Sequence, residues 1–119
     1  MEPLRVLADT IGVSQPAHIQ QLYSSAVKNF PSIEFGAHLH SSPLKALEKI
    51  DAAFEAGCQR FDGAIKGFGG CPMAEDELVG NLATEKILSY LDSKHAAPQL
   101  NRLAFAEALK LADEVFSYH

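Results

Sequence analysis

The chain has 119 residues, of which 47% are hydrophobic and 21% charged, and its formal net charge is −5. This composition is typical of one ordinary globular domain, and the absence of a basic cluster or a long apolar run excludes nucleic acid and membranes as expected partners. Two cysteines, Cys58 and Cys71, are too few for a disulfide framework, and the first residues have no signal-peptide character, so we expect a cytoplasmic location.

The first half of the chain alternates between short apolar segments and amphipathic ones. Residues 4–9 are predicted to form a strand. A helix follows, with Ser14 as its N-cap candidate and Pro16 in its first turn, and Pro31 ends it.

The same alternation continues through the middle of the chain. Residues 33–40 are predicted to form a second strand, and Pro43 opens a second helix that Gly57 ends. The apolar stripe of this helix consists of Leu44, Leu47, Ile50, Ala53 and Phe54.

The second half begins with a third predicted strand at residues 58–65, in which Cys58 is a core residue. A glycine-rich loop over 67–80 and helices over 84–91 and 101–116 follow. The last helix has a wide apolar face that is predicted to be buried, made of Phe105, Ala108, Leu109, Leu111, Ala112, Val115 and Phe116.

Strands that alternate with helices predict an α/β fold with parallel pairing and right-handed crossovers. Three strands are few for a parallel sheet, which needs cover on both faces or closure into a barrel. A closed (β/α)₈ barrel takes about 250 residues. We therefore expect residues 1–119 to be one incomplete domain, part of such a barrel.

A pair of histidines, His38 and His40, ends the second predicted strand. Alternate side chains of a strand share a face, so both imidazoles point away from the helices, about 6–7 Å apart along the strand. This spacing suits two ligands of one metal ion. The alternative is two polar residues near a loop, each satisfied by hydrogen bonds.

The glycine-rich loop carries a second candidate group, the thiol of Cys71. Gly67, Gly69 and Gly70 permit positive φ and close approach to a ligand, and a thiol on such a loop can donate a proton or act as a nucleophile. The alternative is a surface loop with a small buried cysteine.

Three further polar residues are candidates for the same site. The amide oxygen of Asn81 suits Mg²⁺ or Mn²⁺, although a turn residue is the alternative. Glu85 would support the site or only complement the helix dipole. Asp9 would be an active-site carboxylate or would cap the turn after its strand.

Taken together, these motifs resemble a known family. Gly67 to Pro72 (Gly-Phe-Gly-Gly-Cys-Pro) and Gly80 to Glu85 (Gly-Asn-Leu-Ala-Thr-Glu) resemble the glycine-rich loop of hydroxymethylglutaryl-CoA lyases. Asp9-Thr10-Ile11-Gly12 and His38-Leu39-His40 precede them in the family's order. The resemblance covers essentially the whole chain, and the cysteine loop is its most specific part.

The resemblance implies that the three strands are the sixth to eighth of a (β/α)₈ barrel. It implies that His38, His40 and Asn81 bind Mg²⁺ or Mn²⁺, that Cys71 and Asp9 are catalytic, and that Glu85 is a supporting residue. The implied reaction is cleavage of 3-hydroxy-3-methylglutaryl-CoA to acetyl-CoA and acetoacetate.

The chain also departs from the family pattern. Ser41 stands where the family has an acidic residue, and Lys66 replaces a small one. No segment matches the Asp metal ligand and adjacent Arg of the family's first strand, so we expect the isolated chain to be inactive. A homo-oligomer or a complementing N-terminal part is the expected partner.

Two other functions remain open at this point. One is a related metal-dependent acyl-CoA synthase or aldolase of the same superfamily. The other is a non-catalytic fragment that self-associates or complements another subunit through its exposed strand edges.

Overall fold

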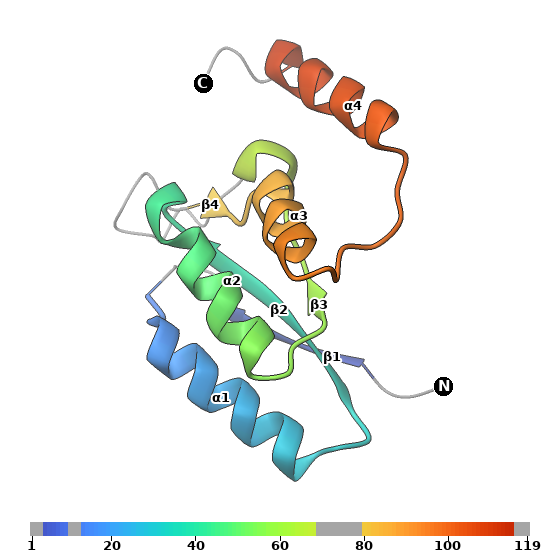
Figure 1. The fold of residues 1–119 in the computed structure, drawn as a ribbon. Coiled ribbons are helices and arrows are strands. Elements are labelled where there is room, and N and C mark those ends of the chain that lie inside the picture. Colours follow the sequence, from blue (N-terminus) through green and yellow to red (C-terminus); the bar gives the residue numbers. More distant parts are fainter. Residues whose placement is uncertain (1–3, 10–12, 69–79, 116–119) are drawn as a thin grey trace.

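The computed structural model describes residues 4–9, 13–68 and 80–115 (Figure 1). In chain order, its elements are β1 (Leu4–Asp9), α1 (Pro16–Asn29), β2 (Glu34–Ser41), the 3₁₀ turn η1 (Pro43–Lys45), α2 (Ala46–Glu55), β3 (Arg60–Phe61), the 3₁₀ turn η2 (Ile65–Gly67), β4 (Gly80–Asn81), α3 (Thr84–Ser93) and α4 (Arg102–Val115).

The sheet has the order β1-β2-β3, with β2 in the centre and both pairings parallel. This confirms the predicted α/β class with a parallel sheet. A fourth strand, β4, pairs with the C-terminal end of β2 in the antiparallel sense, which the sequence analysis did not predict. The C-terminal ends of the parallel strands and the start of α3 therefore meet at one end of the sheet. We call this C-terminal end of the strands the edge that carries the site.

The hydrophobic core lies between β2 and the helices α1 and α2, which cover one face of the sheet (Figure 1). Phe35, Ala37 and Leu39 of β2 face these helices and are buried, as the alternation predicted. Tyr23 of α1 is 1% exposed, and its hydroxyl donates a hydrogen bond to the Gly36 carbonyl at 2.8 Å. Helix α1 is thus fixed to the middle of β2 by a buried polar contact as well as by packing.

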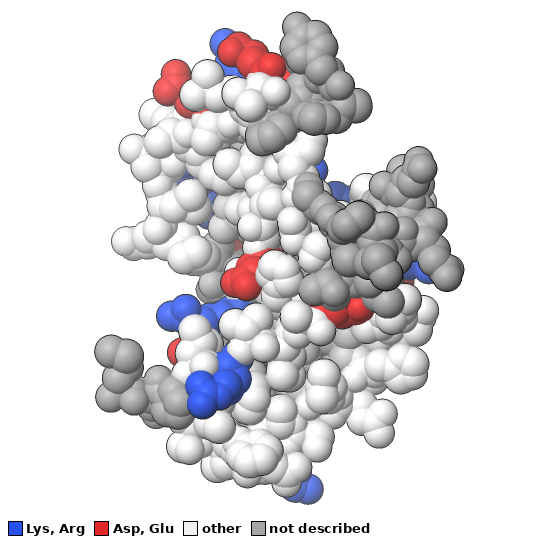
Figure 2. All heavy atoms as spheres, turned by 180° about the vertical axis from the view of Figure 1, so that it is seen from behind, with Lys and Arg blue, Asp and Glu red and all other residues white. Residues whose placement is uncertain are grey.

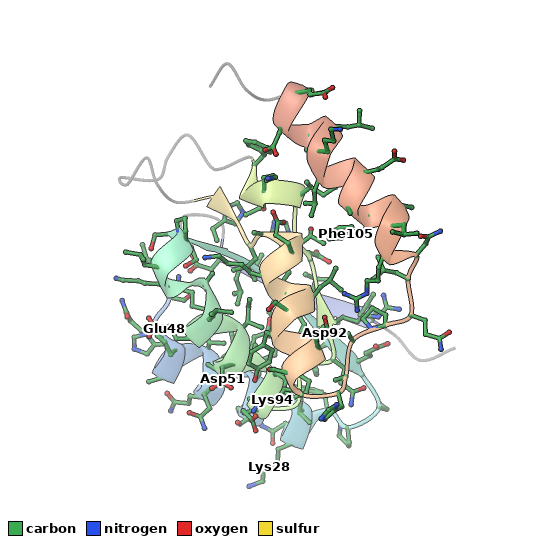
Figure 3. All side chains as sticks on the ribbon, turned by 45° about the horizontal axis from the view of Figure 1, so that its top comes forward. Lys28, Glu48, Asp51, Asp92, Lys94 and Phe105 are labelled. Carbon is green, nitrogen blue, oxygen red and sulfur yellow. The ribbon has the colours of Figure 1, made fainter. Side chains whose placement is uncertain are left out.

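Polar contacts between α2 and the end of α3 continue this layer. The Tyr90 hydroxyl donates to the carboxylate of Asp51 at 2.5 Å, and Lys94 Nζ lies 3.2 Å from Glu55 Oε1. Asp51 and Lys94 are close to each other where the two helices meet (Figure 3). Exposed contacts of this kind orient the helices more than they stabilise them.

Two local predictions were wrong. Ser14 is not the N-cap of α1, because Gln15 holds that position without a side-chain bond while the Ser14 N–H binds Asp9. The third strand is not 58–65 but only Arg60–Phe61. After it, Ala64 forms hydrogen bonds with Leu82 and Thr84, so the chain leaves the sheet to meet α3.

The second predicted helix is also built differently. Pro43 opens a single 3₁₀ turn, and the α-helix begins only at Ala46. Of the predicted apolar stripe, Leu44 is 96% and Leu47 51% exposed. Lys49 is buried instead, together with Ala46, Ile50 and Ala53, so the buried face of α2 differs from the predicted stripe.

The wide buried face predicted for the last helix is only partly present. Ala112 is buried and Phe105, on the side of α4 toward the body of the chain, is half-buried (Figure 3). Leu111 and Val115, also of the predicted face, are 58% and 68% exposed. Phe116 lies outside the described residues. Within the described chain, α4 packs mainly on η2, which is too small to cover so broad a face.

The face of the sheet opposite α1 and α2 is less covered. Leu4, Val6 and Ala8 of β1 lie there and are exposed, beside Glu34, Gly36 and His38 of β2. Seen from behind, the described surface is mostly uncharged, with acidic side chains near its middle (Figure 2). No helix in the described part of the chain is both long and apolar enough to cross a membrane.

Candidate active site

Strand β2 places both histidines on the face opposite the helices, as predicted. The ring centroids of His38 and His40 are 5.3 Å apart, with an angle of 60° between the rings. His40 is 5% exposed, and its Nδ1 atom is buried without a hydrogen-bond partner among the described residues. An unpartnered buried nitrogen is unfavourable and therefore indicates a place for a ligand.

Strand β4 brings Asn81 beside this pair. In the antiparallel register, Asn81 lies opposite His40 and Gly80 opposite Ser41. The Asn81 side-chain nitrogen donates to the Phe68 carbonyl at 2.8 Å, which directs the amide and leaves its oxygen as the acceptor. The predicted ligand Asn81 thus comes from a distant segment of the sequence to the two predicted ligands of β2.

The start of the glycine-rich loop approaches this edge closely. Gly67 has φ = 71°, and a Cβ atom there would lie 2.9 Å from the Asn81 carbonyl oxygen. A side chain at this position would therefore both strain the backbone and push β4 away. Gly69, Gly70 and Cys71 lie outside the described residues.

Glu85 holds the base of the same loop. Its two carboxylate oxygens accept the Lys66 N–H at 3.0 and 3.2 Å. The Lys66 ammonium, in turn, forms a 2.9 Å ion pair with Asp113 of α4. Lys66, which departs from the family pattern, thus links the loop base to the last helix.

Lys49 is a buried cation behind the histidines that the sequence analysis did not identify. It is 2% exposed, and its ammonium donates to the His40 carbonyl at 3.0 Å. Burial lowers the pKa of Lys49, against an opposing effect of Asp9. The sequence does place Lys49 at helical spacing from Ala46, Ile50 and Ala53, which are buried. The predicted stripe through Leu44 and Leu47 assigned the buried face to the leucines instead.

The pKa of His40 lies below its usual value. Burial is the main cause, and the neighbouring charges of His38 and Lys49 act in the same direction, whereas Asp9 opposes them. His40 is therefore held as a neutral imidazole, the form that binds metals.

Asp9 ends β1 at the same edge. Its carboxylate accepts the N–H of Ser14 at 2.7 Å and of Val13 at 3.3 Å. Burial alone would raise its pKa, but these hydrogen bonds and the charge of Lys49 hold the pKa below its usual value. Asp9 pairs with Leu39, whose side chain faces the helices, so its carboxylate leaves the sheet on that side.

Asp62 was also missed by the sequence analysis. It follows β3 directly, and its carboxylate lies 3.2 Å from His38 Nδ1. Its position could have identified it, because polar residues at the C-terminal ends of the strands of a (β/α)₈ barrel lie at the active site. Cys58, by contrast, is fully buried as predicted, and burial raises the pKa of its thiol to about 11.

The donor chemistry of this edge fits a divalent cation. Imidazole nitrogens from His38 and His40 and an amide oxygen from Asn81 suit Mn²⁺, and the oxygen also suits Mg²⁺. Within the described residues, no group of three or more His, Cys, Asp or Glu side chains could hold a metal ion. These three residues would therefore supply one part of a coordination shell.

A site at the C-terminal ends of parallel strands is characteristic of α/β barrel enzymes. The HMGL-like family model matches residues 4–112, and the chain belongs to this family of TIM-barrel lyases.

Curated relatives agree with this assignment. The chain is 32% identical over 108 residues to the hydroxymethylglutaryl-CoA lyase YngG of Bacillus subtilis. The matched segment covers 91% of this chain and 36% of that protein. It is 34% identical over 83 residues to the (R)-citramalyl-CoA lyase of Chloroflexus aurantiacus, covering 70% of this chain and 26% of that protein. The chain therefore spans about a third or less of the length of these relatives.

The fold agrees as well. The chain is similar to the crystal structure of the Bacillus subtilis HMG-CoA lyase, with a TM-score of 0.81 and 31% identity. The match covers 96% of this chain and 38% of that chain.

Proposed function

We propose that the chain forms the metal- and thiol-bearing part of a hydroxymethylglutaryl-CoA lyase active site. In this proposal β1, β2 and the segment from β3 to Ala64 are the sixth to eighth strands of the barrel. The observation that carries it is the pairing of β4 with β2, because it brings Asn81 beside His40 and His38.

His38, His40 and Asn81 would hold Mg²⁺ or Mn²⁺. When bound, the cation would acidify the tertiary hydroxyl of 3-hydroxy-3-methylglutaryl-CoA and orient its free carboxylate. The low pKa of His40 supports this role, since a protonated imidazole has no lone pair for a metal.

Of the remaining side chains, Cys71 would transfer a proton, and the carboxylates of Asp9 and Glu85 would support the site. A base removes the hydroxyl proton, and the C2–C3 bond then breaks to give acetoacetate and the enolate of acetyl-CoA. That enolate then takes one proton on carbon, for which the Cys71 thiol is our candidate donor. Asp9 would supply an ionised carboxylate near the strand ends, from the helix side of the sheet, and Glu85 would fix the loop base through Lys66.

The rest of the barrel would come from additional strands or a partner. The outer edge of β1 is unpaired among the described residues, with Leu4 and Val6 exposed beside it. An open strand edge of this kind favours association. We therefore propose that this chain alone is inactive, and that a homo-oligomer or a complementing N-terminal part completes the site.

Metal binding can be tested on the chain itself. Titration with Mn²⁺ should broaden the NMR signals of the His38 and His40 rings first. His40→Asn and Asn81→Ala should each weaken this effect, whereas His18→Asn, on the exposed side of α1, should not. Equal broadening of all histidines would contradict the site.

Activity can be tested by complementation. Cleavage of 3-hydroxy-3-methylglutaryl-CoA would be measured for this chain alone and after mixing with the N-terminal part of a homologous lyase. We expect turnover only in the mixture, lost with Cys71→Ala and retained with Cys58→Ala. Turnover by the chain alone, or full activity of Cys71→Ala, would contradict the proposal.

A second candidate is cleavage of (R)-citramalyl-CoA. It rests on the 34% identity to a lyase of that name. Comparison of kcat/KM for the two thioesters in the complemented enzyme would separate the candidates.

A further inference from the structure

We propose that Asp62 is a positioning residue that fixes the tautomer and orientation of the His38 ring for metal binding. The inference rests on the proposed metal site and adds to it a residue from a different strand. Its basis is the 3.2 Å contact between Asp62 Oδ2 and His38 Nδ1.

The backbone holds Asp62 in place for this contact. Its N–H donates to the Ala37 carbonyl at 2.9 Å, so the residue after β3 stays bound to β2 next to His38. The parallel register pairs Gly36 with Arg60 and Ala37 with Phe61, so His38 and Asp62 are the next residues of the two strands, and their side chains are 36% and 54% exposed. The contact therefore follows from the register of the sheet, not from a flexible loop.

The chemistry of the pair selects one tautomer. An ionised carboxylate can only accept a hydrogen bond, so the proton of the neutral imidazole must lie on Nδ1. The lone pair is then on Nε2, which is the atom free to bind a cation. Carboxylates that accept from the second nitrogen of a histidine ligand orient the ring and increase its basicity in many metal sites.

The second histidine lacks such a partner in the described chain. His40 Nδ1 is buried without a hydrogen bond, and the hydroxyl of the adjacent Ser41 donates to the Ser42 carbonyl at 2.7 Å. Ser41 stands where the resemblance predicted an acidic residue. Among the described residues, a carboxylate therefore contacts only one of the two histidines, and His40 serves as an internal reference.

A surface ion pair without function is the competing explanation, and the tautomer of His38 distinguishes the two. We would record ¹⁵N–¹H spectra of the histidine rings in the metal-free 119-residue chain, at a pH where the rings are neutral. His38 should carry its proton on Nδ1. In Asp62→Ala it should shift toward the Nε2–H form, while His18, His40 and His95 stay unchanged. Asp92→Ala removes a distant exposed carboxylate and should leave His38 as it is.

A wild-type His38 that is protonated on Nε2, or an Asp62→Ala variant with an unchanged tautomer, would overturn the inference. If Asp62→Ala does not fold, Asp62→Asn is the substitute, because an amide both donates and accepts and should give a mixture of tautomers.

A second measurement keeps this inference separate from the proposed function. In Asp62→Ala, the Mn²⁺ concentration that half-broadens the His40 signal should rise about 10-fold. If wild type shows the Nδ1–H form but no selective broadening by Mn²⁺, the metal site is wrong and the Asp62–His38 relationship still stands. An unchanged Mn²⁺ concentration in Asp62→Ala would overturn the positioning role.

Discussion

Both carboxylate oxygens of Glu85 accept the backbone N–H of Lys66, a residue held at φ = 63°. Residues other than glycine rarely adopt this conformation, which is strained by the Cβ atom. Glu85 therefore holds an unfavourable backbone geometry immediately before Gly67, where the chain enters the glycine-rich loop. The free-energy cost of the strain at Lys66 and the stabilisation by the Glu85 carboxylate can be measured separately.

Replacement of Lys66 by glycine should relieve the backbone strain. Because Lys66→Gly and Lys66→Ala both lose the ion pair with Asp113, their difference contains only the relief of positive φ and the opposing entropy of glycine in the unfolded chain. We expect Lys66→Gly to be more stable than Lys66→Ala by about 1 kcal/mol in urea unfolding. A Lys66→Gly chain that is less stable than Lys66→Ala, as the greater entropy of glycine in the unfolded chain alone would make it, would mean that residue 66 does not adopt positive φ.

Replacement of Glu85 tests the other half of this relationship. Glu85→Ala should destabilise the chain by about 1 kcal/mol, because the Lys66 N–H loses a charged acceptor at a partly exposed position. Glu85→Gln keeps one carbonyl oxygen and should lose less. If the carboxylate served only the dipole of α3, the two variants would lose equal stability, and the amide exchange rate of Lys66 would not change in either.

The buried hydroxyl of Tyr23 provides a test of the core. Tyr23→Phe leaves the Gly36 carbonyl without this donor, and we expect a loss of about 1–2 kcal/mol in the free energy of unfolding. Tyr90→Phe is the matched control, since its hydroxyl binds Asp51 at an exposed position, where water can replace it. A larger loss for Tyr90→Phe would contradict the packing of α1 on β2.

The parts of the fold that the sequence predicted are those in which a local pattern decides the structure. β1 was predicted to the residue, and the alternation in β2 predicted which side chains face the helices. Both depend on a period of two that one buried face enforces. The same rule placed His38 and His40 on a common face.

The parts that were missed depend on contacts between distant segments. The pairing of β4 with β2 joins residues about 40 positions apart and consists of only two residue pairs, too short for a periodic signal. Asp62 meets His38 only because β3 lies in register with β2. Lys49 is buried where its ammonium donates to the His40 carbonyl of β2, whereas hydrophobicity alone assigned the buried face of α2 to leucines.

The thiol of Cys58 predicts a loss of stability in alkali. Burial raises the pKa of this thiol from 9.0 to about 11, so between these values the unfolded chain releases the proton and the folded chain keeps it. Its contribution is therefore complete below pH 9 and is lost as the pH rises through about 11, by about 2–3 kcal/mol in total. Burial of Lys49 lowers the pKa of its ammonium and acts in the opposite direction, so the measurement must compare wild type with Cys58→Ala, in which Lys49 is unchanged. We expect the stability difference between these two chains, from urea unfolding at a series of pH values, to be constant below pH 9 and to shift against wild type above it. A difference that is independent of pH would show that the thiol is as accessible to water in the folded chain as in the unfolded one.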